Sequence, residues 1–252
     1  MKKFLICAAF LPSIGLADDV AFCLEQAYPD IQVEQAVIHF ADGGRLPIGT
    51  LSDKPFRQKL VEASVADQLS QRYPLEFAVP QQYQDAGRIR HDAFFKHLYG
   101  STRVDIEQNL IAINWAPSRQ SVQFNRRNHA AAQLQKVGEE IVRFPELVDY
   151  VNRPLGTFNY RNIAGTSRLS AHSFGIAIDF QLPKHLHHYW RWSGCQNEDT
   201  VCPYPTQLLN DPKLNRIVRI FEKHGFIWGG KWASYDSVHF EYRPELVIQA
   251  CR

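Results

Sequence analysis

The sequence predicts an α+β protein with a mostly antiparallel central sheet flanked by helices. Two observations support this class: helical and strand-like segments follow one another in uneven order, and short strands and loops dominate after Gly156. With 252 residues, 45% of them hydrophobic, the chain is long enough to bury a substantial core. It forms either one elaborated domain or two small ones.

Residues 1–17 have the features of a secretory signal peptide. Lys2 and Lys3 precede an apolar stretch, and Gly15-Leu16-Ala17 supplies a small-x-small cleavage site. The apolar stretch is shorter than the ~20 residues of a membrane-spanning helix, and no later segment comes close to that length. We therefore expect a mature protein that begins at Asp18, spans no membrane and is periplasmic or secreted.

The charge balance gives no sign of a polyanionic partner. The whole chain has 28 basic and 26 acidic residues, and the two lysines of the predicted leader account for the difference. A mature chain without net charge does not favour nucleic acid or an anionic membrane surface as a partner. The sequence leaves the oligomeric state open.

Four cysteines remain after the leader: Cys23, Cys195, Cys202 and Cys251. An even count in an exported chain indicates disulfides, and three pairings are possible. We favour Cys195 with Cys202, which closes a short polar loop, and Cys23 with Cys251, which ties the two ends of the mature chain together. A cysteine zinc site is the alternative, but Cys-x6-Cys lacks the close spacing of zinc fingers and ribbons.

The first half of the chain predicts strands and helices in turn. Residues 32–50 predict a strand, a turn at Asp42-Gly43-Gly44 and a second short strand. Residues 55–72 predict one amphipathic helix, because apolar residues recur at helical spacing. The segment FFKHLYG predicts another helix. The segment NLIAINWAP predicts a strand with three apolar residues on one face: Ile111, Ile113 and Trp115.

Two helices are expected in the second half. Good helix formers run from Asn128 to Phe144, and whether that helix continues through Pro145 is left open. A last helix is expected from about Pro212 to Lys223, closed by His224-Gly225.

A segment that begins at Ser170 places a histidine and an acid near one another. It alternates from Gly175 onward, so its apolar residues face a core: Ile176, Ile178 and Phe180. Asp179 then lies on the opposite face. If the chain bends at Gly175, His172 folds back over that same face and converges with Asp179.

The segment from Trp232 to Tyr242 follows the same pattern. Its buried face is expected to hold Val238, Phe240 and Tyr242. His239 and Glu241 then share the opposite face. Two histidines and one carboxylate would give zinc three protein ligands and leave a fourth position open, as in catalytic zinc sites. From the residues alone, an ordinary surface or capped core position for these histidines stays equally open.

The pattern S-x-H-x-x-G-x-A-x-D, followed by D-x-x-H-F-E, resembles the D-alanyl-D-alanine carboxypeptidase and dipeptidase (VanY-like) family of zinc peptidases. That family shares its fold with the amino-terminal domain of Sonic hedgehog. The resemblance implies that His172, Asp179 and His239 hold Zn²⁺ and that Asp236 is the general base. Aspartate at that position places this chain nearer the carboxypeptidase and L-alanyl-D-glutamate endopeptidase branches than the dipeptidase branch.

The resemblance is strongest from about Gly156 to Leu246. Upstream it is weaker, where DAGRIRHDAFFKHLYG is similar to a segment of bacterial members and has no assigned role. The family uses an upstream arginine to stabilise the substrate or the developing oxyanion, and we assign that role to Arg161. Arg168 is the alternative, and a surface ion pair is the interpretation without a catalytic role.

Other conspicuous side chains have simpler explanations. The histidines of the KHLHH stretch lack an accompanying acid, so we expect a solvated loop. Tyr189, Trp190 and Trp192 are expected to pack rather than to line a groove. Gly229-Gly230 is expected to be a turn, because no phosphate-binding lysine and hydroxyl residue follow it.

The sequence thus predicts three parts: a signal peptide over residues 1–17, an N-terminal α+β region of unknown role over 18–124, and a zinc peptidase catalytic domain over 125–252. The expected substrate is a peptidoglycan stem peptide, cut by a D,D-carboxypeptidase or by an endopeptidase at an L,D junction. In the expected metal-assisted hydrolysis, Asp236 takes a proton from water and Arg161 stabilises the oxyanion. The alternative is a non-catalytic, zinc-containing cell-wall binding protein of the same fold.

Overall fold

The computed structural model describes residues 16–163 and 166–251. Residues 1–15 of the predicted signal peptide lie outside the described residues, and helix α1 (Leu16–Ala27) begins the described chain. Helices combine with antiparallel strand pairs throughout, which confirms the α+β class. No helix in the described part of the chain combines the length and the apolar character needed to cross a membrane.

Three antiparallel sheets organise the described residues. The first contains β1 (Ile31–Glu34), β2 (Val37–Phe40) and β3 (Arg45–Pro47). The second is the hairpin of β4 (Leu110–Trp115) and β5 (Gln120–Asn125). The third has the order β6 (Pro154–Gly156), β7 (Ala177–Phe180), β9 (His239–Tyr242) and β8 (Phe226–Trp228).

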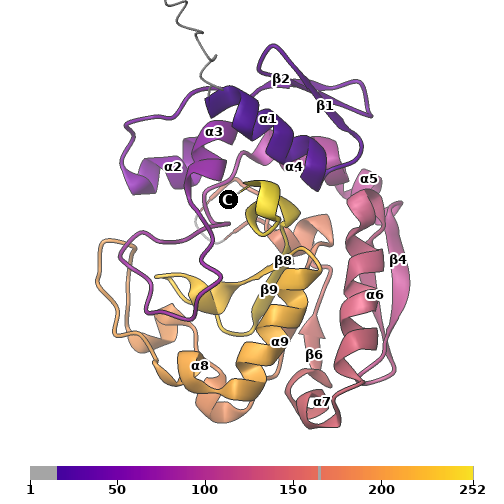
Figure 1. Ribbon diagram of the computed structural model, residues 1–252, viewed down its shortest axis with the longest axis vertical. Helices are drawn as coiled ribbons and strands as arrows, with labels where there is room; N and C mark the ends of the chain where they lie inside the picture. The colour runs from indigo at the N-terminus through magenta and orange to yellow at the C-terminus, as the bar shows by residue number, and fades with distance from the viewer. Residues whose placement is uncertain (1–15, 164–165, 252) are drawn as a thin grey trace, which may run out of the picture.

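Eight further α-helices are described: α2 (Phe56–Glu62), α3 (Val65–Ser70), α4 (Asp92–Tyr99), α5 (Arg103–Glu107), α6 (Ala130–Ile141), α7 (Pro145–Val151), α8 (Gln207–Asn210) and α9 (Pro212–Lys223). Short 3₁₀ helices are η1 (Arg127–His129), η2 (Ala171–Phe174), η3 (Lys184–Leu186), η4 (Trp190–Ser193), η5 (Gly229–Lys231), η6 (Pro244–Leu246) and η7 (Gln249–Cys251). In Figure 1 helices α1 to α4 lie above the four-stranded sheet, and α9 contacts both α6 and β8.

Several predicted elements are confirmed. Helix α9 runs from Pro212 to Lys223, its first turn is capped by the Asp211 carboxylate, and Gly225 after it has a left-handed φ of 86°. The question at Pro145 is also answered. Helix α6 ends before it, and Pro145 opens α7 at a position where its missing N–H is no loss.

Two predictions about the N-terminal part are wrong in detail. The strand expected from residue 32 onward is two strands, β1 and β2, because Gln35 and Ala36 form a tight turn with φ of 50° and 61°. The single helix expected over 55–72 is broken into α2 and α3. Ser64 caps α3 in a reciprocal capping box with Asp67, so an S-x-x-D signal within the apolar pattern marked a new helix start.

The strand prediction at β4 holds, but its apolar face is only partly covered. Ile113 and Trp115 are buried, whereas Ile111 is 41% exposed. Helix α6 covers the Trp115 end, where Gly138 lets the indole approach closely. The partner strand β5 and helix α5 were not foreseen.

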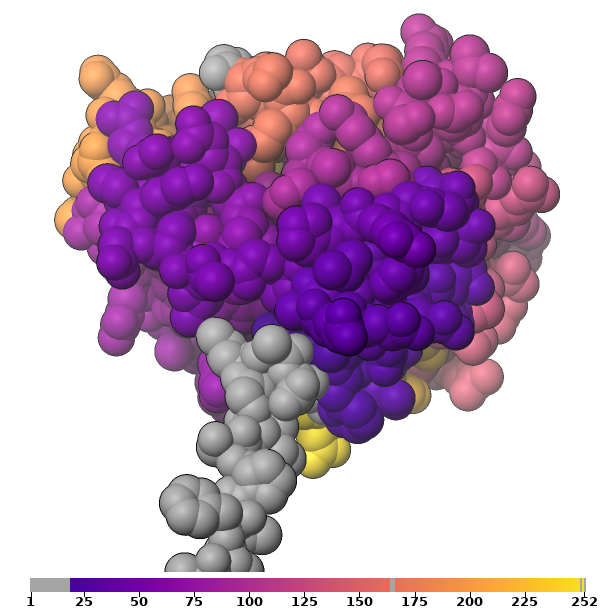
Figure 2. Space-filling view, turned by 90° about the horizontal axis from the view of Figure 1, so that it is seen from above, coloured from indigo at the N-terminus to yellow at the C-terminus, as the bar shows by residue number. Residues whose placement is uncertain are grey.

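The N-terminal part of the chain packs on the C-terminal part through one continuous core and several polar links. Cys23 in α1 forms a disulfide with Cys251, and Cys195 forms one with Cys202, so both favoured pairings are confirmed. The Tyr28 hydroxyl donates to Glu245 at 2.6 Å. Figure 2 shows N-terminal residues covering most of one face, with part of the C-terminal end beside them.

Candidate metal centre

Strands β7 and β9 place Asp179 and His239 directly opposite each other. They are paired residues in an antiparallel ladder, so their side chains leave the sheet on the same face. The apolar residues that alternate with them are buried, as the period of two requires: Ile176, Ile178, Phe180, Val238, Phe240 and Tyr242.

His172 reaches the same face through a bend at Gly175. His172 lies in η2, whose first residue is preceded by Ser170, and the Ser170 hydroxyl accepts the His172 N–H at 3.1 Å. Gly175 has a φ of 66°, and a Cβ there would meet a Leu110 methyl at 2.5 Å. Glycine is therefore required at this position, both for the backbone conformation and for the space.

The three side chains bring one donor atom each to a common point. Asp179 Oδ1 lies 2.9 Å from His239 Nδ1 and 3.2 Å from His172 Nε2, and the two nitrogens are 3.2 Å apart. In a tetrahedral zinc site with bonds of about 2.0–2.1 Å, neighbouring ligand atoms are about 3.3 Å apart. The described residues therefore fit a zinc ion at this point.

The outer hydrogen bonds fix which nitrogen of each histidine is available. His172 Nδ1 donates to the carbonyl of Thr157 at 2.7 Å, which leaves Nε2 free for a metal. His239 Nε2 donates to Glu241 at 3.2 Å, so Nδ1 is the nitrogen that contacts Asp179 within the donor group. Carbonyl and carboxylate partners of this kind orient the histidine ligands of zinc sites. Glu241 is itself held by Arg243 at 3.0 Å, so it orients His239 from outside the group of three donors.

The charges within the cluster are strongly coupled. Burial would raise the pKa of Asp179, but hydrogen bonds from His172 and His239 outweigh it and hold that pKa well below its usual range. Burial acts against protonation of His239, yet hydrogen bonds to Asp179 and Glu241 raise its pKa to about 10. The carboxylates favour a cation at the cluster, and a metal held by His239 Nδ1 would displace its proton.

Asp236 lies beside the three donors without joining them. Its backbone N–H donates to the Gly229 carbonyl at 3.0 Å, and its Oδ1 is buried with no hydrogen-bond partner in the described structure. Burial raises the pKa of Asp236 to about 6. A carboxylate with a pKa near neutrality in a cleft is suited to accept a proton from water.

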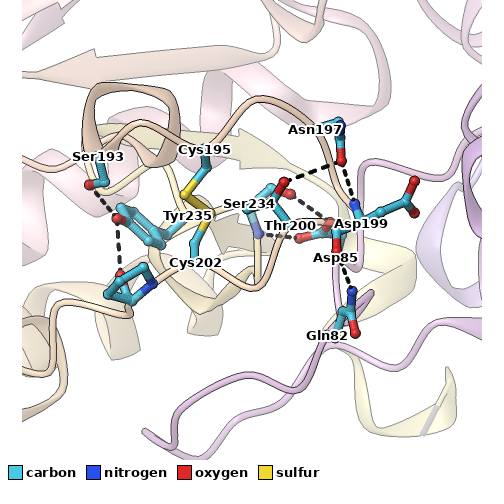
Figure 3. Close-up of a disulfide and its surroundings, with 11 residues drawn as sticks. Gln82, Asp85, Ser193, Cys195, Asn197, Asp199, Thr200, Cys202, Ser234 and Tyr235 are labelled. Atoms are coloured by element: carbon cyan, nitrogen blue, oxygen red, sulfur yellow. Dashed lines mark hydrogen bonds between the residues drawn. A yellow bond between two sulfur atoms is a disulfide. The ribbon is translucent and has the colours of Figure 1, made fainter.

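The residues before Asp236 are held by hydrogen bonds to residues that flank the Cys195–Cys202 disulfide and to Asp85 (Figure 3). The Tyr235 hydroxyl shares a 2.6 Å hydrogen bond with Ser193 and donates to the Pro203 carbonyl at 3.3 Å. The backbone and hydroxyl of Ser234 donate to Asp85 at 2.9 and 3.0 Å. The N-terminal part of the chain thereby helps to position Asp236.

A cleft of about 260 Å³ contains the metal donors, Asp236 and several arginines. Arg161 lies at its exposed edge, and its only described side-chain hydrogen bond goes to the Asn162 carbonyl at 3.4 Å. Arg168, the alternative from the sequence, lines the same cleft and is buried. Both candidates therefore line the cleft that contains the donors.

Two arginines from the N-terminal part, Arg88 and Arg90, also line the cleft, and no role was predicted for them. Their segment, GRIR, carried the weaker part of the family resemblance, and that was the signal available. Tyr189 and Trp190, expected to pack, also line the cleft, while Trp192 is 67% exposed. In the described chain, the His185-His188 stretch forms no metal-binding group.

Comparison with known proteins gives one match. A family model described as D-alanyl-D-alanine carboxypeptidase matches residues 164–242. That range contains His172, Asp179, Asp236 and His239, but neither Arg161 nor Arg90. No curated protein and no solved structure matches the chain, and the likeness to the Sonic hedgehog fold stays a prediction. The matched part of the chain is thus similar to a family of peptidases that act on D-Ala-D-Ala substrates.

Proposed function

We propose that this protein is an exported, zinc-dependent peptidase that hydrolyses peptidoglycan stem peptides, as a D,D-carboxypeptidase or as an endopeptidase at an L,D junction. One observation carries the proposal: three donor atoms with the spacing of a tetrahedral zinc site lie beside a buried, unpartnered carboxylate. These residues fall within the segment that matches the carboxypeptidase family.

In this proposal His172, Asp179 and His239 hold zinc, which supplies Lewis-acid polarisation of a peptide carbonyl and acidification of water. Asp236 accepts the proton of the attacking water and returns it to the leaving amine. Arg161 donates to the oxygen on which negative charge develops. Glu241 keeps His239 in the tautomer that presents Nδ1 to the metal.

The predicted leader and the two disulfides support export to an oxidising compartment, the periplasm or beyond. We propose that residues 125–252 are catalytic and that residues 18–124 shape the cleft. A division after residue 124 falls inside β5, so these are parts with different roles that share one core.

A non-catalytic zinc-binding protein is the competing function. It would need the three donors but no proton acceptor. The Asp236 carboxylate, buried with one oxygen unpartnered, is an unfavourable feature that a binding protein has no reason to keep.

Digestion of purified muropeptides tests the proposed function. We expect the zinc-loaded protein to release D-alanine or to split the stem at an L,D junction, as read by mass spectrometry, and the chelator-treated protein to do neither. Zinc-loaded protein that retains muropeptides on a column but leaves every bond intact would favour the binding protein.

A further inference from the structure

Two buried arginines in the cleft wall have no counter-ion. Arg90 and Arg168 are only 4% and 7% exposed, and both line the cleft that contains the metal donors. Among the described residues, neither forms an ion pair with a carboxylate: the ion pairs of cleft arginines involve Arg88 and not these two. Buried charges without a partner are unfavourable, and two neighbouring like charges are more so.

Each of the two arginines donates a side-chain hydrogen bond to a backbone carbonyl in the other's segment. Arg90 donates to the carbonyl of Leu169, and Arg168 donates to the carbonyl of Arg88 at 3.4 Å. The Nε atom of each is buried and has no acceptor in the described structure. A guanidinium offers five N–H donors and each of these two has one described side-chain hydrogen bond, so each keeps donors without an acceptor among the described residues.

The electrostatic state of the pair agrees with this geometry. Burial and the neighbouring charges of Arg90 and Arg88 lower the pKa of Arg168 to about 10. Burial also lowers the pKa of Arg90. Both side chains remain cationic near neutral pH, and an anion in the cleft would remove the unfavourable repulsion.

Two other buried or partly buried arginines in the same region do form ion pairs with carboxylates. Arg88 contacts Asp85 at 3.0 Å and Glu198 at 2.8 Å. Arg243, fully buried, contacts Glu241 at 3.0 Å and Glu245 at 2.6 Å. Arg88 lines the same cleft and is paired, so the missing carboxylate partner is a feature of Arg90 and Arg168 and not of every arginine there.

The segment that carries Arg90 is anchored close to the metal donors. Arg243 donates to the Gly87 carbonyl at 2.8 Å. A Cβ on Gly87 would lie 3.1 Å from Glu241, whose carboxylate holds His239. Arg90, Arg168 and the metal donors therefore line one cleft, in which a single peptide can contact both groups.

We propose that Arg90 and Arg168 bind the free C-terminal carboxylate of the peptide substrate and thereby make the protein a carboxypeptidase. The proposal rests on the proposed function, since it identifies which end of the stem peptide occupies the cleft. The guanidinium fork matches a carboxylate, and charge-assisted bonds of this kind are the strong ones. An internal side-chain carboxylate of the stem has the same chemistry and is separated by the experiment.

The test compares three synthetic stem pentapeptides with the zinc-loaded protein: one with a terminal D-Ala-D-Ala carboxylate, one with that terminus amidated, and one with only the internal glutamate carboxylate amidated. We expect terminal amidation to lower kcat/KM by about 10- to 100-fold and internal amidation to leave it unchanged. Equal rates on the terminal acid and the terminal amide overturn the proposal. So does a loss caused by internal amidation alone.

Variants then test whether the preference for the terminal acid over the terminal amide depends on the two arginines. Arg90→Met and Arg168→Met should raise KM for the acid and bring the acid-to-amide ratio close to one. Arg88→Met is the matched control: it removes a guanidinium from the same cleft wall that is already paired, and the ratio should stay as in the unmodified protein. Because each ratio is measured on a single preparation, it is independent of how much of that protein folds.

A binding measurement separates this proposal from the proposed function. N-acetyl-D-alanine and N-acetyl-D-alaninamide are titrated calorimetrically into the zinc-loaded protein. If no stem peptide is cut but the acid binds at least tenfold more tightly, and Arg168→Met removes the difference, the proposed function fails and the carboxylate site stands. If peptides are cut but acid and amide bind equally, the carboxylate site fails and the peptidase stands.

Discussion

Two groups of charged residues line the cleft and differ in their hydrogen-bond and ion-pair partners. The metal wall consists of His172, Asp179, His239 and Asp236, and the arginine wall consists of Arg90 and Arg168. On the metal wall, each histidine has an acceptor outside the donor cluster, and Asp179 is hydrogen-bonded by both of them. On the arginine wall, Arg90 and Arg168 are buried, and neither forms an ion pair with a carboxylate of the described residues. In our proposals a cation binds to the first group and an anion to the second.

The largest effect is expected for Asp236, the member of the metal wall without a partner for its Oδ1. Asp236→Ala should retain zinc and the fold yet lose about 100- to 10,000-fold in turnover, the span usual for loss of a general base. Glu241→Gln should cost less in turnover and weaken zinc binding in part, because Glu241 orients His239. Muropeptide kinetics with zinc analysis of each variant measures both effects.

The opposite pattern would exchange the roles. If Asp236→Ala kept near-normal turnover while the zinc-loaded Glu241→Gln protein were inactive, the assignment of Asp236 as the base would be wrong.

The next prediction compares the loss of unfolding free energy when a paired and an unpaired buried cation are removed. Lys231, nearly fully buried, contacts Glu222 at 2.6 Å and donates to the carbonyls of Pro74 and Leu75 at 3.1 and 2.7 Å. Removal of one member of such a pair costs about 3–5 kcal/mol of unfolding free energy, so Lys231→Met should be strongly destabilised. Arg168→Met should lose much less, because no carboxylate is left behind. Urea unfolding of both variants makes the comparison, and equal losses would show that Arg168 is structural.

The sequence predicted the metal wall because all its members come from two strand-like segments with readable alternation. Asp179 and His239 needed only the period of two and the pairing of their strands, and Gly175 marked the bend that brings in His172. The arginine wall could not be predicted, because Arg90 and Leu169, whose contact builds it, are 79 positions apart. Tertiary packing alone brings them together.

The errors in the fold prediction have local origins. The break between α2 and α3 was present in the sequence as the Ser64–Asp67 capping box, but an apolar pattern of helical spacing ran across it. The turn at Gln35 and Ala36 had no glycine or proline to announce it.

A smaller effect is expected at the edge of the cleft. Arg161→Lys should lower turnover by about tenfold with the zinc content unchanged, because lysine keeps the charge but not the fork of donors. Arg168→Lys measured in parallel shows which arginine stabilises the transition state. Full turnover in Arg161→Lys together with a kcat loss in Arg168→Lys would move that role to Arg168.

The last prediction concerns the pH dependence, where the expected change is at most tenfold per pH unit. Asp236 accepts a proton only as the carboxylate, so kcat/KM should fall as the pH drops through its pKa of about 6 and approach a plateau above it. A bound cation favours the carboxylate, so the midpoint should lie at or below that value. The residual turnover of Asp236→Ala should lack this limb, and an unchanged limb in that variant would assign it to another group.

The most direct test of the metal centre is zinc analysis of protein purified without chelator and equilibrated at low free zinc. One zinc per chain is expected in the unmodified protein. His172→Ala, Asp179→Ala and His239→Ala should each lose it, because the site then lacks one of three protein ligands, while Asp236→Ala should keep it. One zinc per chain in His239→Ala under the same conditions would contradict the assignment of the metal site.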